Sequence, residues 1–256
     1  GLEIAEAYQK SLPRNTLKPG GKVLFAGAGG PIGRMHVQRA IEFSDPPKTI
    51  VCTDVSNLRL ADLKNTYGDQ AIEKGIDIIF SNPMEKEKYN TLIDSIQAEG
   101  GFDDVIVLAP IPPLIEEITG YIANEGLVNV FAGIARGTAV NIDFSRIVFD
   151  GVRYIGHSGS ALGDMQLTLN KIESGELNAK RTVAAVASLH YGKEGLRAVK
   201  EAKYPGKVVI FNHIKEFPVT PLEEFKDKLP SVAALFADGE WTNEAEKEFL
   251  RLMLEE

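Results

Sequence analysis

Short apolar runs alternate with amphipathic segments along the first 160 residues of the chain. Glycine, proline and polar residues bound these runs, which is typical of strands buried on both faces of a parallel sheet. The predicted strands cover residues 23–26, 49–53, 76–80, 105–108, 128–131 and 152–155. The segments between them have helical character and cover residues 32–43, 56–67, 85–98 and 112–124. This alternation predicts an α/β fold, a doubly wound parallel six-stranded Rossmann sheet with helices on both faces.

The later part of the chain carries different patterns. Residues 140–146 alternate strictly between apolar and polar, which indicates a half-exposed edge strand that can pair with another subunit. Residues 162–174 and 192–203 have helical character, and residues 206–211 form one further predicted strand. The charged, amphipathic tail from Pro221 predicts a C-terminal helical extension on the surface.

The start of the chain suggests how it is organised. It begins with Gly1 instead of methionine, directly in a helix-like segment at residues 2–12. We therefore expect a piece of a longer protein: a linking helix from a missing N-terminal domain at 1–19, a Rossmann domain at 20–160, and C-terminal helices, one strand and a tail at 161–256. A processed or tag-derived start on a complete protein is the alternative.

Composition narrows the class of protein. No run approaches the ~20 apolar residues that a membrane helix needs, so no membrane partner is expected. A single cysteine, Cys52, excludes an internal disulfide framework and fits the reducing cytoplasm. The net charge of −8 argues against a nucleic-acid partner.

A glycine-rich loop follows the first predicted strand and leads directly into a helix. It reads Gly27-Ala28-Gly29-Gly30-Pro31-Ile32-Gly33, with Gly27, Gly30, Pro31, Ile32 and Gly33 as the candidate binding residues. Glycines at such a corner make the tight turn, let the backbone approach a pyrophosphate and pack the helix against the strand. The N-terminus of the helix then offers free N–H groups to the phosphates. No Gly-Lys-Ser/Thr follows, so the loop is not a P-loop.

An acidic residue completes the candidate dinucleotide site. Asp54 ends the second strand, 21 residues after Gly33, where a carboxylate can accept hydrogen bonds from ribose hydroxyls and repel a 2′-phosphate. This position favours NAD over NADP. Arg59 lies five residues further on and could stack on adenine or hold a 2′-phosphate, which weakens that preference. A helix cap is the structural alternative for Asp54.

The glycine loop is compatible with more than one dehydrogenase family. Short-chain dehydrogenases need a lysine four residues after a tyrosine, and none of the seven tyrosines has one. The sequence instead resembles the medium-chain, zinc-type dehydrogenases over nearly all of residues 1–215. The matching segments are residues 17–24, 54–60, 101–105, 126–128, 155–158, 174–177 and 206–210. Within this family it is similar to the sugar-phosphate and polyol branch, which includes the L-sorbose-1-phosphate reductases, on residues 101–109, 131–133 and 241–247.

The resemblance implies a function and further site residues. It implies an NAD(P)-dependent oxidoreductase that interconverts alcohol and ketone groups of a polyol, sugar or sugar phosphate, assembled as a homodimer or tetramer. It places the nicotinamide against the ends of strands four to six, near Ala109, Gly133, His157 and Ser158. The family's zinc is held by cysteine, histidine and carboxylate of the preceding domain. We expect zinc only there, and no catalytic or metal-binding residue in this chain, which alone would be inactive.

Other interpretations stay open. Cys52 and His36 are expected to be packing residues, and the histidines lack ligand spacing. An NAD-binding or redox-sensing module without its own catalysis is therefore one alternative. The loop also has one residue more than the Gly-x-Gly-Pro-x-Gly form, and the zinc-free quinone reductases have a similar loop.

Overall fold

The computed structural model describes residues 17–156, 159–177, 182–201 and 203–254. The chain forms two compact units, Gly1–Leu177 and Asn178–Glu256. The helix expected at residues 2–12 lies outside the described residues. The division falls later than the boundary at residue 160 that the sequence suggested, because α7 (Leu162–Glu173) belongs to the first unit.

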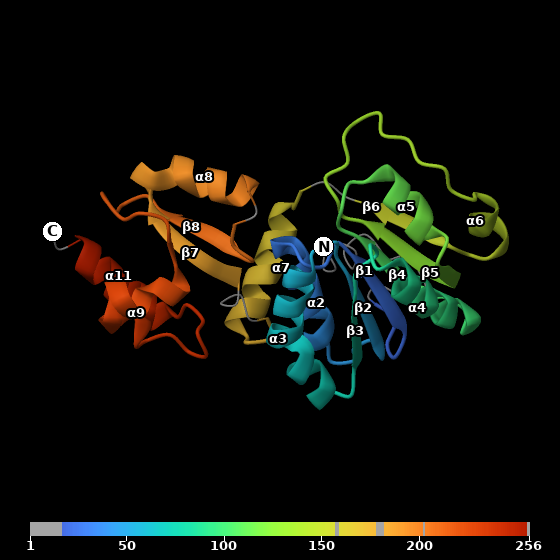
Figure 1. The fold of residues 1–256 in the computed structure, drawn as a ribbon, viewed down its shortest axis with the longest axis horizontal. Coiled ribbons are helices and arrows are strands. Elements are labelled where there is room, and N and C mark those ends of the chain that lie inside the picture. The colour runs from blue at the N-terminus through green and yellow to red at the C-terminus, as the bar shows by residue number, and fades with distance from the viewer. Residues whose placement is uncertain (1–16, 157–158, 178–181, 202, 255–256) are drawn as a thin grey trace. The chain divides into compact units, whose positions relative to one another are not determined.

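The first unit contains the predicted parallel sheet (Figure 1). Its strands are β1 (Lys22–Ala26), β2 (Thr49–Thr53), β3 (Asp77–Ser81), β4 (Phe102–Val107), β5 (Ile122–Val130) and β6 (Arg153–Gly156). Their order in the sheet is β3-β2-β1-β4-β5-β6, and all pairs are parallel. The chain therefore reverses its direction of winding between β1 and β4, where open α/β sheets bind ligands at the carboxyl ends of their strands.

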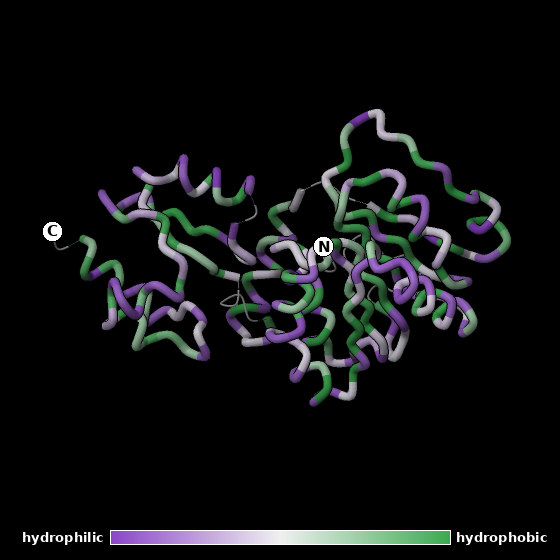
Figure 2. The backbone as a smooth tube through the Cα atoms, in the orientation of Figure 1, coloured by the Kyte–Doolittle hydropathy of each residue, from purple (hydrophilic) through white to green (hydrophobic). Residues whose placement is uncertain are grey.

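Helices cover both faces of this sheet. The helices of this unit between the strands are α2 (Pro31–Glu42), α3 (Asn57–Glu73), α4 (Lys86–Ala98), α5 (Pro112–Thr119) and the short α6 (Ser145–Phe149). The apolar sides of α2 and α3 form one core with β1 and β2, and α4 and α5 form a second core against the other face. Apolar stretches follow the strands in Figure 2, as expected for strands buried on both faces. The predicted doubly wound fold is confirmed.

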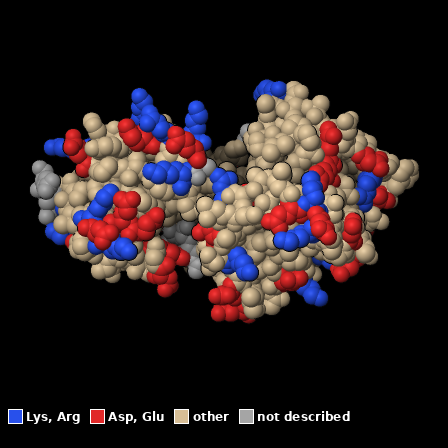
Figure 3. Space-filling model, in the orientation of Figure 1, with Lys and Arg blue, Asp and Glu red and all other residues tan. Residues whose placement is uncertain are grey.

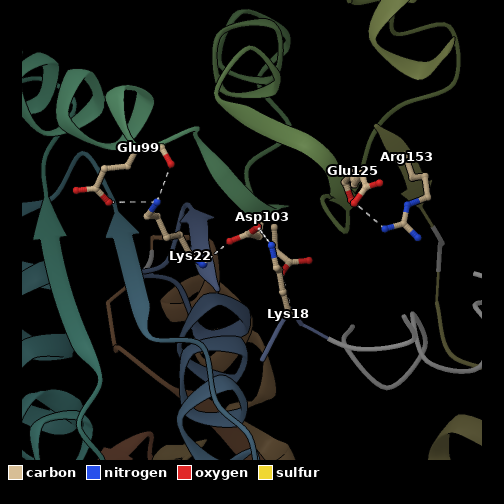
Figure 4. A network of polar contacts seen from close by, with 7 residues as sticks. Lys18, Lys22, Glu99, Asp103, Glu125 and Arg153 are labelled. Atoms are coloured by element: carbon tan, nitrogen blue, oxygen red, sulfur yellow. Dashed lines mark hydrogen bonds and ion pairs between the residues drawn. The ribbon is translucent and has the colours of Figure 1, made fainter. Parts of the chain in front are cut away.

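A polar network holds the amino end of the sheet, opposite the expected site (Figure 4). Asp103 accepts hydrogen bonds from Lys18 Nζ at 2.5 Å and from the Lys22 backbone N–H at 2.9 Å. The buried Asp104 accepts one from the Lys18 backbone N–H at 2.9 Å. A Cβ at Gly21 would lie 2.8 Å from Asp103 Oδ2, so this corner requires glycine. Two segments that carry the family resemblance, 17–24 and 101–105, thus meet here and have a structural role.

Three sequence predictions in this unit need correction. Residues 140–146 form no strand, because Asp143 Oδ1 accepts hydrogen bonds from Ser145 and starts the turn into α6 instead. The helix predicted to reach residue 124 ends at Thr119, and β5 already begins at Ile122. Conversely, α3 continues past its predicted end at residue 67 to Glu73.

The second unit has its own sheet and core. Its strands β7 (Val183–Ser188), β8 (Lys207–Phe211) and β9 (Thr220–Pro221) pair in the order β8-β7-β9. Its α-helices are α8 (Gly192–Lys200), α9 (Phe225–Lys228), α10 (Pro230–Ala233) and α11 (Asn243–Leu254). Two short 3₁₀ turns, η2 (Leu189–Tyr191) and η3 (Leu222–Glu224), precede α8 and α9.

The sequence underestimated this unit. The only strand predicted after residue 160, at residues 206–211, corresponds to β8. The structure has two further strands, β7 and β9: β7 pairs with β8 and also with β9. The tail after Pro221 also does more than cover a surface. Its aromatic side chains form a buried cluster around Phe225, Trp241 and Phe249. Spacing along a single helix does not reveal such a core, because it is assembled from several short segments.

Candidate dinucleotide-binding site

The glycine loop turns tightly between the ends of β2 and β4. The backbone N–H groups of Gly27 and Ala28 both donate to the carbonyl oxygen of Thr53, each at 2.9 Å. Gly27 has a φ of +92°, a conformation that favours glycine. A Cβ there would also lie 3.2 Å from the Cβ of Ala109, the second residue after β4. The structure therefore brings the loop and the predicted Ala109 together.

Gly33 packs α2 against the loop. A Cβ on Gly33 would lie 2.4 Å from the carbonyl oxygen of Ala28, a distance that no side chain tolerates. The backbone of α2 therefore approaches the end of β1 as closely as glycine permits. This is the helix-packing role that the motif predicts for its last glycine.

Gly30 faces open space at the N-terminus of α2. A Cβ built on Gly30 meets nothing within 4 Å, and its φ of −77° is accessible to any residue. Pro31 occupies the first turn of α2, and this turn contains no acidic residue. The N-cap residue is Gly30, which has no side chain that could cap the helix. The first N–H groups of a helix have no partner within the helix. An anion can therefore reach these groups along the open side of Gly30.

Asp54 connects the loop to the end of β2. Its Oδ2 accepts a hydrogen bond from the Gly29 backbone N–H at 3.1 Å, and its Oδ1 accepts one from the Ser56 N–H at 2.9 Å. The side chain is almost buried, with 9% of Asp54 exposed. Each carboxylate oxygen has two lone pairs, so both can accept another hydrogen bond. The cap of α3 is Ser56, whose Oγ accepts from the Arg59 N–H at 3.4 Å.

Gly29 belongs to the candidate site and was not among the binding residues predicted from the sequence. A Cβ on Gly29 would lie 2.7 Å from both Asp54 Oδ2 and Arg59 Cβ, so only glycine fits between them. The consecutive glycines at positions 29 and 30 are the signal in the sequence. One is needed for the contact with Asp54, and the other leaves space for a ligand.

Three other predicted residues, Ile32, Arg59 and Gly133, lie in segments that follow the carboxyl ends of strands. Ile32 is half exposed in the first turn of α2, and Gly133 is exposed in the loop that follows β5. Arg59 lies in the first turn of α3. His157 and Ser158 lie outside the described residues.

The single cysteine and the described histidines are either buried in the core or exposed on the surface. Cys52 is fully buried in β2, and burial raises the pKa of its thiol, which makes it an unreactive core residue as expected. His36 is buried in α2, with its ring 4.8 Å from that of Phe131 and its Nδ1 2.9 Å from the Ile32 carbonyl oxygen. His190 and His213 are exposed.

Zinc does not fit the described part of this chain. No three histidine, cysteine, aspartate or glutamate side chains gather there in a way that could hold a metal ion. We therefore assign no zinc ligand to these residues. In contrast, the open side of Gly30, the start of α2 and Asp54 fit a dinucleotide.

Among the described helices, none combines the length and apolar character needed to cross a bilayer.

The sequence relatives of this chain include two enzymes with a named activity. The chain is 28% identical to the mannitol-1-phosphate 5-dehydrogenase of Aliivibrio fischeri over 212 residues, covering 82% of this chain and 49% of the relative. It is also 28% identical to the L-sorbose 1-phosphate reductase of Klebsiella pneumoniae over 233 residues, covering 90% and 55%. The chain thus spans about half the length of the curated relatives it matches. No model of a protein family matches it.

Comparison with solved structures gives the fold. The zinc-dependent alcohol dehydrogenase 2 from Streptococcus pneumonia aligns with a TM-score of 0.62 and 21% identity, covering 84% of this chain and 59% of that one. A zinc-binding dehydrogenase from Sinorhizobium meliloti, bound to NADP, aligns with a TM-score of 0.57 and 18% identity, covering 75% and 52%. The resemblance inferred from the motifs is therefore confirmed: the sequence relatives include an L-sorbose 1-phosphate reductase, and zinc-dependent alcohol dehydrogenases share the fold.

Proposed function

We propose that this chain is the coenzyme-binding part of an NAD-dependent oxidoreductase that interconverts alcohol and ketone groups of a polyol, sugar or sugar phosphate. The observation that carries this proposal is the open side of Gly30 at the start of α2, beside the carboxylate of Asp54. Both lie at the carboxyl ends of the strands, beside the point between β1 and β4 where the sheet reverses its direction of winding.

Each part of the site has a role in this proposal. The backbone from Gly30 to Gly33 binds the pyrophosphate, and Asp54 accepts hydrogen bonds from the hydroxyl groups of the adenosine ribose. Ala109 and Gly133 line the position of the nicotinamide. When bound, the nicotinamide gives or takes the hydride of the reaction. The chain itself orients the coenzyme.

Two charged side chains bear on the choice of coenzyme. The carboxylate of Asp54 repels a 2′-phosphate and binds an unmodified ribose, which favours NAD. Arg59 begins in the same corner, because its Cβ lies 2.7 Å from the position of a Cβ on Gly29. Its guanidinium is the one group of this pair that would favour NADP, the coenzyme found in the Sinorhizobium meliloti dehydrogenase. We propose that Asp54 dominates, because it is fixed by two hydrogen bonds.

The substrate class rests on the sequence relatives. Both named relatives act on phosphorylated six-carbon compounds according to their names, a mannitol phosphate and a sorbose phosphate. We propose a substrate of this class and a protein located in the cytoplasm, where such phosphates occur.

We also propose that the protein forms a homodimer. Strand β6 is at one edge of the sheet, and three apolar side chains close to it in the sequence are largely exposed: Phe144, Val148 and Phe149 at 70%, 75% and 83%. Edge backbone groups and exposed aromatic side chains together favour pairing with a second copy. Strand β6 thus takes the role of the pairing edge that the sequence had suggested for residues 140–146.

A thermal-shift experiment tests the proposed site. Ligand binding to the folded state adds RT ln(1 + [L]/Kd) to the free energy of unfolding and so raises the unfolding temperature. We expect NADH to raise the unfolding temperature of this chain and to leave that of a Gly30→Val variant unchanged. An equal shift for both proteins would show that NADH binds elsewhere.

A further inference from the structure

Asn82 is the first residue after β3, and its side chain reaches back to the end of β2. Its amide Nδ2 donates to the Val55 carbonyl oxygen at 3.1 Å and to Asn57 Oδ1 at 2.7 Å. Its Oδ1 accepts a hydrogen bond from the Met84 backbone N–H at 2.9 Å. Only 9% of Asn82 is exposed. Its polar atoms are thus used to join two loops that follow neighbouring strands.

The segment that Asn82 holds is the one that carries Asp54. Val55 directly follows Asp54, and its side chain is 67% exposed, so apolar burial does not anchor this residue. Asn57 begins α3, and its own Nδ2 donates to Glu85 Oε1 at 3.1 Å. The hydrogen bonds from Asn82 therefore fix the backbone between Asp54 and α3 to the end of β3.

This arrangement affects how Asp54 can discriminate between coenzymes. A ribose hydroxyl must lie within about 3 Å of a carboxylate oxygen to form a hydrogen bond. Repulsion between the carboxylate and a 2′-phosphate also weakens as the distance between them grows. If the segment after Asp54 relaxes, NADH loses hydrogen bonds and NADPH meets less repulsion. Both changes reduce the preference for NADH.

We infer that Asn82 is a positioning residue for coenzyme specificity: it holds Asp54 in the place where the carboxylate accepts the ribose of NADH and excludes a 2′-phosphate. This inference rests on the proposed function, because it requires a dinucleotide in the site. Asn82 does not contact the coenzyme in this account. It acts through the backbone at Val55.

The surroundings of Asn82 allow the side chain to be removed. A surface hollow between α3, β3 and α4 has Asn82 in its wall, together with Ser81, Lys64 and Lys88. Water from this hollow can reach the carbonyl oxygen of Val55 once the amide is gone. An Asn82→Ala variant is therefore expected to fold.

The test compares NADH and NADPH affinities by calorimetric titration of the whole chain. For Asn82→Ala we expect the ratio of NADH to NADPH affinity to fall by about three- to tenfold, the effect of losing one or two hydrogen bonds. The exposed Asn90 on α4 provides a matched control, and Asn90→Ala should keep the wild-type ratio. In an Asp54→Ala background, Asn82→Ala should change the ratio no further, because the two residues act through one carboxylate.

Other outcomes separate the inference from the proposed function. If Asn82→Ala weakens both coenzymes equally and keeps the ratio, Asn82 has only a structural role and the inference is wrong. If the wild-type chain binds neither coenzyme, the proposed function itself fails. Should Asn82→Ala not fold, Asn57→Ala removes one of the two Nδ2 contacts at an exposed position and should lower the ratio about twofold. An unchanged ratio there contradicts the inference.

Discussion

The backbone N–H of Gly29 donates a hydrogen bond to Oδ2 of Asp54, with 3.1 Å between the nitrogen and the oxygen. This bond joins the glycine loop after β1 to the acid after β2. A charged acceptor makes it stronger than a bond between neutral groups. The glycine loop and Asp54 are therefore joined directly, and a change at Asp54 should affect the loop as well as the proposed ribose position.

Replacing Asp54 should change both affinity and selectivity. Asp54→Ala removes the acceptor for the Gly29 and Ser56 N–H groups and the charge that opposes a 2′-phosphate. We expect the affinity for NADH to fall at least tenfold, while that for NADPH falls less. Asp54→Asn keeps one acceptor oxygen and should give an intermediate ratio. Titration with both coenzymes measures this, and an unaltered ratio in both variants would refute the ribose assignment.

Gly30 and Gly33 should respond differently to added side chains. In Gly30→Val the new side chain points into open space, so we expect only a small fall in unfolding temperature, from the poorer N-cap residue, and loss of NADH binding. In Gly33→Ala the Cβ meets the Ala28 carbonyl oxygen, so stability should fall by about 1–3 kcal/mol or more. Thermal unfolding and NADH titration of both variants provide the comparison. A destabilised Gly30→Val that still binds NADH would reverse our assignment of the two glycines.

Sequence reasoning was most successful where each residue pattern is set by local physics. The apolar strand runs and the turn at Gly27 gave the sheet, its winding and the position of the loop. Contacts between loops were not accessible in this way. The bonds from Gly29 and Asn82 to the segment at Asp54 join residues 25 to 27 positions apart, and no periodicity marks them. The aromatic core around Trp241 was missed for the same reason.

The exposed apolar side chains near β6 lead to a prediction about assembly. We expect the chain to be a dimer at micromolar concentration, and Phe149→Glu to shift it towards monomer by placing a charge on the paired surface. Light scattering after size-exclusion chromatography measures the mass. Leu58→Glu also replaces an exposed apolar side chain by glutamate, at an 81% exposed position in α3, and serves as the control. A wild-type monomer would contradict the proposed dimer.

An ion pair between the buried Arg39 of α2 and the half-exposed Glu176 predicts a dependence of stability on pH. Arg39 Nη2 lies 2.9 Å from Glu176 Oε1, and Lys171 Nζ lies 3.3 Å from the same oxygen. Desolvation acts to raise the pKa of Glu176, but the hydrogen bonds and charges of Lys171 and Arg39 outweigh it and lower the pKa below the ordinary 4.5. The stabilisation is therefore complete above that ordinary value and is lost as the pH falls through the lowered one.

The Glu176→Gln variant isolates this contribution. At pH 7 it should unfold about 1–3 °C below the wild type, because Glu176 is half exposed and solvent screens the pair. The difference should disappear in acid, where Glu176 is protonated in both the folded and unfolded states. Calorimetric scans across this range provide the measurement, and a difference that persists or grows in acid would be inconsistent with the ion pair.

The central claim is that the glycine loop and Asp54 form an NAD site, and calorimetric titration of the chain with NADH and, separately, NADPH tests it most directly. We predict saturable binding of NADH, clearly weaker binding of NADPH, and no NADH binding by the folded Gly30→Val variant. A folded wild-type chain that binds neither coenzyme, or a Gly30→Val variant that binds NADH as well as the wild type does, would contradict the claim.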